Sequence, residues 1–219
     1  MVRVKICGIT SARDARAAIE FGAAALGFNF YEKSPRAIAP ADAWKIRRTL
    51  PKMIQAVGVF VDWKPAAVLA LAQALELSAA QLHGDESPRH AGYCARRISV
   101  IKAFRVGPDF SLMELRKFRS VSQFLLDAAR AGQYGGTGHT TNWGFARKAA
   151  LKRPIILAGG LRPENVAEAI LAVRPYAVDV ASGVESKPGK KDHGKMKEFF
   201  AEVERANREL TRRGNETTK

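Results

Sequence analysis

The sequence lacks most of the features that mark secreted, membrane and metal-binding proteins. Its 219 residues include only two cysteines, Cys7 and Cys94, which are too few for a disulfide framework. The opening residues, MVRVKICGIT, lack the apolar run and small-residue cleavage site of a signal peptide. The most apolar stretch, 65–82, is interrupted by glutamine and glutamate, unlike a membrane span. Neither H-x-x-x-H nor C-x-x-C occurs, so we expect no metal, no membrane contact and a cytoplasmic location.

Acidic residues are also scarce. There are 21 Asp and Glu against 36 Lys and Arg, so the formal net charge is +15. No block of five like charges occurs, and the aromatic residues are scattered through apolar segments, so we expect no nucleic-acid partner. The positive charge instead suits a small anionic substrate. A basic barrel that binds nucleic acid is the alternative outside the enzymes.

Apolar runs alternate regularly with amphipathic segments along the chain. Strands are predicted over 2–7, 24–30, 54–61, 79–82, 98–104, 123–127, 154–158 and 176–181. Helices are predicted over 11–21, 40–50, 65–75, 88–95, 110–118, 143–151, 163–171 and 194–208. Four of these helices begin at a proline, a residue favoured in the first helical turn.

Strands that are almost wholly apolar and alternate with helices indicate a parallel sheet covered on both faces. Eight such units predict an α/β fold, a single-domain (β/α)8 TIM barrel over residues 1–208, with a polar, frayed tail over 209–219. An open doubly wound sheet is the alternative. It favours a G-x-G-x-x-G turn after the first strand, and that turn here is Cys7-Gly8-Ile9-Thr10.

Reactive side chains stand where predicted strands end, and in barrels this rim carries the active site. Cys7 ends the first strand, and its thiolate can act as a base where a neighbour lowers its pKa. Asp127 ends the sixth strand after an apolar run, where partial desolvation suits a general acid. Their structural alternatives are a buried small hydrophobe for Cys7 and a helix cap or salt bridge for Asp127.

Other polar residues at the same rim are candidates for binding substrate. Arg36 follows the second strand beside a proline and can clamp a carboxylate, although it can also be a surface charge. Gln81 and His83 stand at the end of the fourth strand, and Asp179 lies on the eighth. A histidine at such a position is more often a hydrogen-bonded rim residue than a metal ligand.

Glycines after the seventh and eighth strands predict a phosphate site. Glycine lets backbone N–H groups approach an anion, and many barrels bind phosphate at these two loops. The candidates are Gly159, Gly160, Ser182 and Gly183, together with Gly136 from the glycine-rich segment 132–138. The long connection 128–142 is expected to be a lid that closes over the substrate.

Side-chain alternation also makes a prediction about Cys7. Residues two apart on a strand share a face, so Lys5 points into the barrel if Cys7 points to its mouth. The eighth strand closes the barrel beside the first and carries Asp179. Because a lysine inside a barrel is costly unless paired, Lys5 and Asp179 are predicted to form an ion pair. Lys5 then favours the Cys7 thiolate, and Asp179 partly cancels that effect. The alternative turns Val4 and Ile6 inward.

These motifs together resemble one family of enzymes. The matching segments occur in order over about residues 2–202. They are KICGIT (5–10), LGF (26–28), SPR (34–36), VGVF (57–60), QLHG (81–84), GGTG (135–138), LAGGL (157–161) and DVASGVE (179–185). The chain resembles phosphoribosylanthranilate isomerase, an enzyme of tryptophan synthesis. One segment departs from the family pattern: HTTNW (139–143) replaces a basic residue followed by Phe-Asp-Trp.

The resemblance implies a cofactor-free Amadori rearrangement. N-(5-phosphoribosyl)anthranilate, a small anionic sugar phosphate, becomes 1-(2-carboxyphenylamino)-1-deoxyribulose 5-phosphate. The resemblance makes Cys7 the general base, Asp127 the general acid and Arg36 the residue that holds the anthranilate carboxylate. It places the phosphate in the loops of Gly159, Gly160, Ser182 and Gly183. The protein is expected to be a monomer or a homodimer.

Two related barrel enzymes are the nearest alternatives. The histidine-pathway isomerase performs the same chemistry with two aspartates, whereas the first strand here ends in Cys7. Indole-glycerol phosphate synthase is similar in its use of sugar phosphates, but it is expected to use lysines and a glutamate at strand ends. Lys102, on the fifth predicted strand, is the one strand residue that invites that interpretation.

Overall fold

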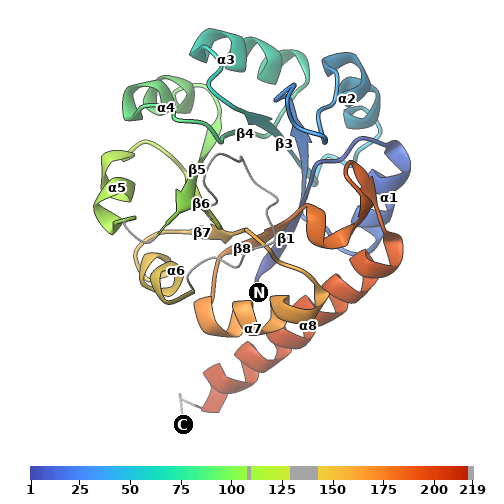
Figure 1. Ribbon diagram of the computed structural model, residues 1–219, viewed down its shortest axis with the longest axis vertical. Coiled ribbons are helices and arrows are strands. Elements are labelled where there is room, and N and C mark those ends of the chain that lie inside the picture. The colour runs from blue at the N-terminus through green and yellow to red at the C-terminus, as the bar shows by residue number, and fades with distance from the viewer. Residues whose placement is uncertain (108–109, 129–142, 217–219) are drawn as a thin grey trace.

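The computed structural model describes residues 1–107, 110–128 and 143–216. Its strands form a closed barrel in chain order, β1 to β8, and the helices surround that barrel in Figure 1. The strands are β1 (Arg3–Cys7), β2 (Ala25–Asn29), β3 (Gln55–Phe60), β4 (Ala79–Leu82), β5 (Ser99–Val106), β6 (Gln123–Ala128), β7 (Ile155–Leu157) and β8 (Ala177–Val180). The predicted (β/α)8 barrel is confirmed.

Several of the helices begin at a capping serine or at a proline. They are α1 (Ala12–Glu20), α2 (Pro40–Arg47), α3 (Pro65–Ala74), α4 (Pro88–Ala95), α5 (Leu112–Lys117), α6 (Trp143–Ala150), α7 (Pro163–Val173) and α8 (His193–Glu216). Ser11 caps α1 by accepting a hydrogen bond from the Asp14 amide, and Ser87 caps α4 through the His90 amide. Proline opens α2, α3, α4 and α7.

Two features after β8 differ from the predicted elements. A short 3-10 turn, η1 (Ser182–Val184), leads into a hairpin of β9 (Glu185–Lys187) and β10 (Lys190–Lys191). The last helix continues past Arg208 to Glu216, so most of the segment expected to be a frayed tail is helical. The reason is packing: Leu210 lies against the core, and Asn207 bonds to both backbone polar groups of Val2.

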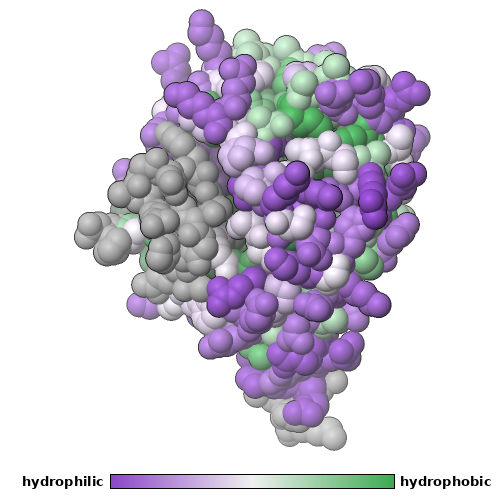
Figure 2. All heavy atoms as spheres, turned by 45° about the vertical axis from the view of Figure 1, so that its right-hand side comes forward, coloured by the Kyte–Doolittle hydropathy of each residue, from purple (hydrophilic) through white to green (hydrophobic). Residues whose placement is uncertain are grey.

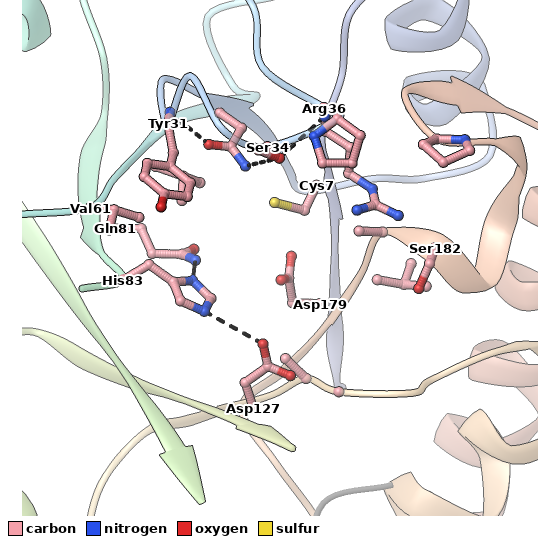
Figure 3. Close-up of a pocket in the computed structure, with 18 of the residues that line it drawn as sticks. Cys7, Tyr31, Ser34, Arg36, Val61, Gln81, His83, Asp127, Asp179 and Ser182 are labelled. Carbon is pink, nitrogen blue, oxygen red and sulfur yellow. Dashed lines mark hydrogen bonds and ion pairs between the residues drawn. The ribbon is translucent and has the colours of Figure 1, made fainter. Parts of the chain in front are cut away.

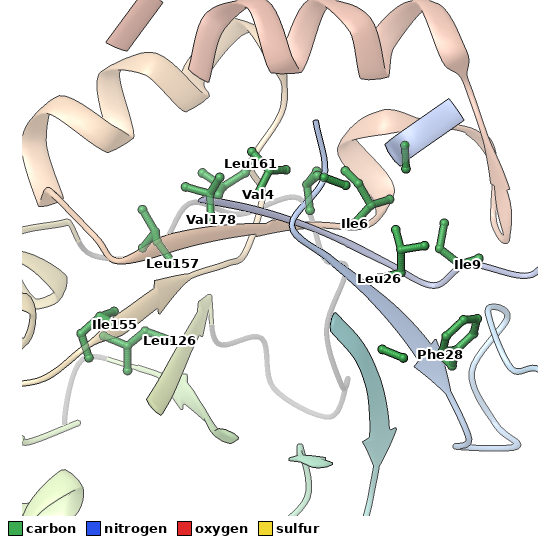
Figure 4. Packing of buried hydrophobic residues seen from close by; sticks show 14 of the residues in the cluster. Val4, Ile6, Ile9, Leu26, Phe28, Leu126, Ile155, Leu157, Leu161 and Val178 are labelled. Carbon is green, nitrogen blue, oxygen red and sulfur yellow. The ribbon is translucent and has the colours of Figure 1, made fainter. Parts of the chain in front are cut away.

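Alternate residues of the strands build two separate apolar layers. Between the strands and helices lie side chains such as Val4, Ile6 and Leu126, and Figure 4 shows this layer from close by. A smaller cluster fills the barrel interior. Its members are Ala25, Val57, Ala79, Ile101, Ala103, Leu125, Ile156, Ala158 and Ala177. The alternation therefore points Val4 and Ile6 at the helices and Lys5 into the barrel.

Hydrophilic side chains cover most of the molecular face shown in Figure 2. Among the residues that the structure describes, no helix is long and apolar enough to cross a membrane.

The two apolar layers lead to a stability prediction. Leu126 is fully buried between β6 and the helices, so Leu126→Ala should lower the free energy of unfolding by about 2–5 kcal/mol through lost burial and a residual cavity. Leu151→Ala is the matched control, because that side chain is 67% exposed and its loss should change stability by less than about 0.5 kcal/mol. Chemical denaturation measures both, and equal effects would contradict the assignment of Leu126 to the core.

Candidate active site

The mouth of the barrel holds a pocket of about 570 Å³ at the C-terminal ends of the strands. Most of the predicted site residues line it: Cys7, Arg36, Gln81, His83, Asp127, Gly159, Gly160, Asp179 and Ser182. Gly183 directly follows Ser182 in η1. Gly136 and the predicted lid segment 129–142 lie outside the described residues. The structure therefore gathers residues from six strands, or from the loops that follow them, into one cavity.

Cys7 and Asp127 lie on opposite sides of this pocket, with Asp179 between them in Figure 3. Cys7 ends β1, and its backbone pairs with Gly27 on β2. A Cβ at position 27 would lie 2.9 Å from the Cys7 Sγ and 3.2 Å from the Lys5 Nζ. Gly27 therefore leaves the space that the thiol and the ammonium group occupy.

The predicted ion pair between Lys5 and Asp179 is confirmed. The two residues are register partners across β1 and β8, and the Lys5 Nζ donates to the Asp179 Oδ1 at 2.7 Å. The Lys5 side chain is 3% exposed and that of Asp179 is 9% exposed. Both point into the barrel directly below Cys7, because residues five and seven of the strand share a face.

Burial raises the pKa of the Cys7 thiol above its ordinary value. Lys5 opposes this rise, Asp179 adds to it, and Lys191 also opposes it. Lys5 and Asp179 thus act on the Cys7 pKa in the predicted opposite directions, and desolvation outweighs the benefit to the thiolate. The pKa of Lys5 itself is raised: burial lowers it, but the Asp179 carboxylate and the Cys7 thiolate more than offset that effect.

Asp127 faces a histidine that a glutamine holds in place. The His83 Nε2 lies 3.5 Å from the Asp127 Oδ2, longer than a well-formed hydrogen bond, and Gln81 contacts the other ring nitrogen at 2.8 Å. The Gln81 Oε1 is buried and has no hydrogen-bond partner in the described part of the chain. Gln81, His83 and Asp127 all line the pocket, so this unpaired oxygen lies beside the space that a ligand would occupy.

Arg36 lies beside the pocket in a bidentate ion pair with Glu185. Its Nε donates to both carboxylate oxygens, at 2.9 and 3.1 Å, and its Nη2 donates to Oε2 at 2.7 Å. The pair leaves Nη1 unused. Sequence reasoning identified Arg36 but missed Glu185, because the hairpin that carries it was not recognised.

The glycines predicted to bind phosphate lie in two loops that only glycine can form as they are. Gly159 and Gly160 have φ values of 86° and 65°, which side chains other than glycine rarely adopt. A Cβ at Gly183 would lie 1.9 Å from the Leu161 carbonyl oxygen, so the loops after β7 and β8 meet there without room for a side chain. Asn165 fixes the first loop by donating to the Gly160 carbonyl at 3.0 Å.

Several polar residues of the pocket were not predicted. Asn29, Tyr31, Lys33 and Ser34 line it from the end of β2 and the loop that follows. Asn29 donates to the Ser34 Oγ at 3.0 Å and accepts from the Tyr31 amide at 2.9 Å. The sequence does contain a signal for Asn29, because it is a polar residue at the end of an apolar strand.

Lys102 lies outside the pocket. Its neighbours Ile101 and Ala103 face the barrel interior, so Lys102 points toward the helices, where it pairs with Glu86 at 2.8 Å. This orientation removes the observation that favoured an indole-glycerol phosphate synthase. Among the described residues, no group of three His, Cys, Asp or Glu side chains could hold a metal ion.

Comparison with known proteins identifies one family. The family model described as N-(5'-phosphoribosyl)anthranilate (PRA) isomerase matches residues 4–202. The N-(5'-phosphoribosyl)anthranilate isomerase of Geobacter sulfurreducens is 53% identical over 200 residues, covering 91% of this chain and 97% of the relative. That of Trichlorobacter lovleyi is 50% identical over 207 residues, covering 94% of this chain and all of the relative.

Solved structures agree. The crystal structure of phosphoribosyl anthranilate isomerase from Thermotoga maritima has a TM-score of 0.87 and 44% identity, covering 93% of this chain and 99% of that one. Another, at TM-score 0.84 and 43% identity over the same shares, is a complex with reduced 1-(o-carboxyphenylamino)-1-deoxyribulose 5-phosphate. A third describes monomers generated from the dimeric Thermotoga maritima protein, at TM-score 0.84 and 42% identity, again covering 93% and 99%.

The buried ion pair predicts how the Cys7 thiol titrates. Lys5→Met removes the positive charge that opposes the raised pKa, so the Cys7 pKa should rise further. Asp179→Asn removes a negative charge, so the same pKa should fall. The rate of alkylation of Cys7, measured across pH, reports both shifts.

Lys102→Met is the matched control for this titration. It removes another buried lysine, 3% exposed, that faces away from the pocket, so the Cys7 pKa should stay unchanged. Shifts in the same direction for Lys5→Met and Asp179→Asn would contradict the electrostatic account, because a general loosening of the barrel acts on both variants alike.

Proposed function

Since the chain belongs to the phosphoribosylanthranilate isomerase family, we propose residue roles for the reaction that it catalyses in tryptophan biosynthesis. That reaction is the Amadori rearrangement of N-(5-phosphoribosyl)anthranilate to 1-(2-carboxyphenylamino)-1-deoxyribulose 5-phosphate. One observation carries the assignment: a thiol and a carboxylic acid face each other across a pocket with an arginine and glycine-rich loops at its edge.

Asp127 is the general acid and Cys7 the general base. Asp127 protonates the furanose ring oxygen, the C1′–O bond breaks, and the nitrogen lone pair forms a Schiff base at C1′. The Cys7 thiolate then removes the proton from C2′, and the electron pair moves toward nitrogen to give an enolamine. Proton return at C1′ and loss of the enol proton yield the ketone. The opposite placement of the two residues fits both proton transfers.

The remaining polar residues hold the substrate between these two groups. The Arg36 guanidinium binds the anthranilate carboxylate, and the backbone around Gly159, Gly160, Ser182 and Gly183 binds the phosphate. Gln81, His83 and Asp179 contact the sugar from the pocket wall. The complex of the structural relative with a reduced product supports a sugar-phosphate ligand, and the net charge of +15 would steer such an anion inward.

We also propose a cytoplasmic location and a monomeric or homodimeric state. Cys7 must stay a free thiol to act as a base, which a reducing compartment ensures, and both cysteines are free in the structure. The dimeric Thermotoga maritima relative supports the homodimer. Sedimentation analysis of the purified protein distinguishes the two states.

The acid–base pair gives the first kinetic prediction. Cys7→Ser and Asp127→Asn should each lower kcat by roughly 10²-fold or more, because each removes one proton-transfer group. The fluorescence loss of phosphoribosylanthranilate measures turnover, and circular dichroism checks that the fold is intact. A variant that keeps near-normal turnover would remove its residue from the proposed role.

Arg36 gives the second kinetic prediction. Arg36→Met should chiefly raise KM, by the equivalent of about 1.5–3 kcal/mol, because a charge-assisted hydrogen bond to the substrate is lost. Arg47→Met is the matched control, since this arginine lies outside the pocket, where it donates to the Glu76 carbonyl at 3.1 Å and lies 3.9 Å from the Glu76 carboxylate. If Arg36→Met leaves both KM and kcat unchanged, the carboxylate is held elsewhere.

A further inference from the structure

We propose that Glu185 is a positioning residue that aims Arg36 at the substrate carboxylate, and that Lys191 keeps the resulting cluster positively charged. The inference rests on the proposed role of Arg36 and extends it to the β9–β10 hairpin. Three observations carry it: the geometry of the Arg36–Glu185 pair, the second cation on the same carboxylate, and the anchoring of the hairpin to neighbouring loops.

The pair between Arg36 and Glu185 fixes a plane as well as a distance. Nε and Nη2 both donate to the carboxylate, so the guanidinium cannot rotate about its last bonds without breaking one contact. The Arg36 side chain is 14% exposed and that of Glu185 only 4%. The aliphatic part of the Arg36 side chain packs on Gly8, where an added Cβ would lie 2.8 Å from the Arg36 Cδ. The contact therefore holds the guanidinium in one orientation and does not use Nη1, the nitrogen that would meet the substrate carboxylate.

A carboxylate paired with Arg36 would by itself cancel the charge that attracts the substrate. Lys191 removes this difficulty, because its Nζ donates at 2.9 Å to the Glu185 Oε1, which also accepts from the Arg36 Nε. Burial lowers the pKa of Lys191, and the Glu185 carboxylate opposes that effect. With both cations protonated, two cations share one anion and the cluster carries one net positive unit. The Lys191 side chain is 0% exposed, so its ammonium group lies inside this cluster and not in solvent.

The hairpin is tied to the loops that carry the other site residues. Lys191 also donates through Nζ to the Ala181 carbonyl at 3.1 Å, next to the proposed phosphate loop, and its amide donates to Asp14 on α1 at 3.2 Å. The Thr10 hydroxyl, in the loop after β1, donates to the carbonyl of Gly189 at the hairpin turn. Glu185 thus holds Arg36 from a support that is fixed relative to β1 and β8.

A purely structural ion pair is the competing explanation, and the chain contains a suitable comparison. Glu86 and Lys102 form a more deeply buried pair at 2.8 Å, with side chains 1% and 3% exposed, and neither lines the pocket. Glu86 also accepts from the Gly84 amide, next to His83, at 3.0 Å, and glutamine keeps an acceptor oxygen for that bond. Glu86→Gln should therefore reproduce the cost of unpairing a buried lysine with little effect on substrate binding.

The test compares Glu185→Gln with Glu86→Gln in steady-state kinetics and thermal unfolding. Glu185→Gln should raise KM about tenfold or more while changing kcat much less, because substrate binding loses the orientation of Arg36. Glu86→Gln should lower the unfolding temperature and leave KM unchanged. A KM for Glu185→Gln within about twofold of the parent would overturn the inference.

The double variant Arg36→Met/Glu185→Gln separates this inference from the proposed function. If Glu185 acts through Arg36, the double variant should have the same KM as Arg36→Met alone. A KM that rises multiplicatively in the double variant would show that Glu185 acts independently. If Arg36→Met itself leaves KM unchanged, the proposed role of Arg36 fails instead.

Arg36→Lys keeps the test available if Glu185→Gln does not fold. Lysine retains the charge but cannot form the planar two-bond contact, so KM should approach that of Arg36→Met. A normal KM for Arg36→Lys would show that charge alone is sufficient and that the orientation set by Glu185 is irrelevant.

Discussion

Each residue of a barrel strand faces either the interior or the helices, and the register between β1 and β8 fixes which way the reactive residues face. Lys5 opposite Asp179 places both inside the barrel, and the same parity brings Cys7 to its mouth. A shift of one residue would turn the thiol toward the helices and bring Ile6 inward. The chemistry of the pocket therefore depends on backbone pairing first and on side-chain identity second.

Charges in and around the pocket occur in compensated groups. Lys5 is paired with Asp179, and Arg36 and Lys191 share Glu185. Asp179 also acts on the pKa of Cys7, and Glu185 also orients Arg36. Such pairing costs desolvation, so it is a poor way to gain stability alone. Its benefit is geometric and electrostatic, because it holds cations where a thiolate and an anionic substrate need them.

Much of this arrangement could be predicted from the sequence, because it follows from periodicity. Alternation along the chain predicts eight strand–helix units and places Cys7 and Asp127 at strand ends. Barrel closure then predicts the pair of Lys5 with Asp179. The partner of Arg36 could not, because Glu185 lies 149 positions away on a short hairpin with no periodic signal. The extent of α8 was also missed, since the contacts of Asn207 and Leu210 are tertiary.

The Lys5–Asp179 pair also links the conformational stability of the barrel to the pH at which Cys7 ionises. The folded-state pKa of Lys5 is raised, so its stabilising contribution is fully present below the pKa of lysine in the unfolded chain, about 10.4, and is lost as pH rises through the higher folded value. The pKa of Cys7 is raised as well, so alkaline solution generates its thiolate. Increasing alkalinity thus generates more of the Cys7 thiolate, and the stabilising contribution of the Lys5 ammonium to the barrel is lost once the pH passes the folded-state pKa of Lys5.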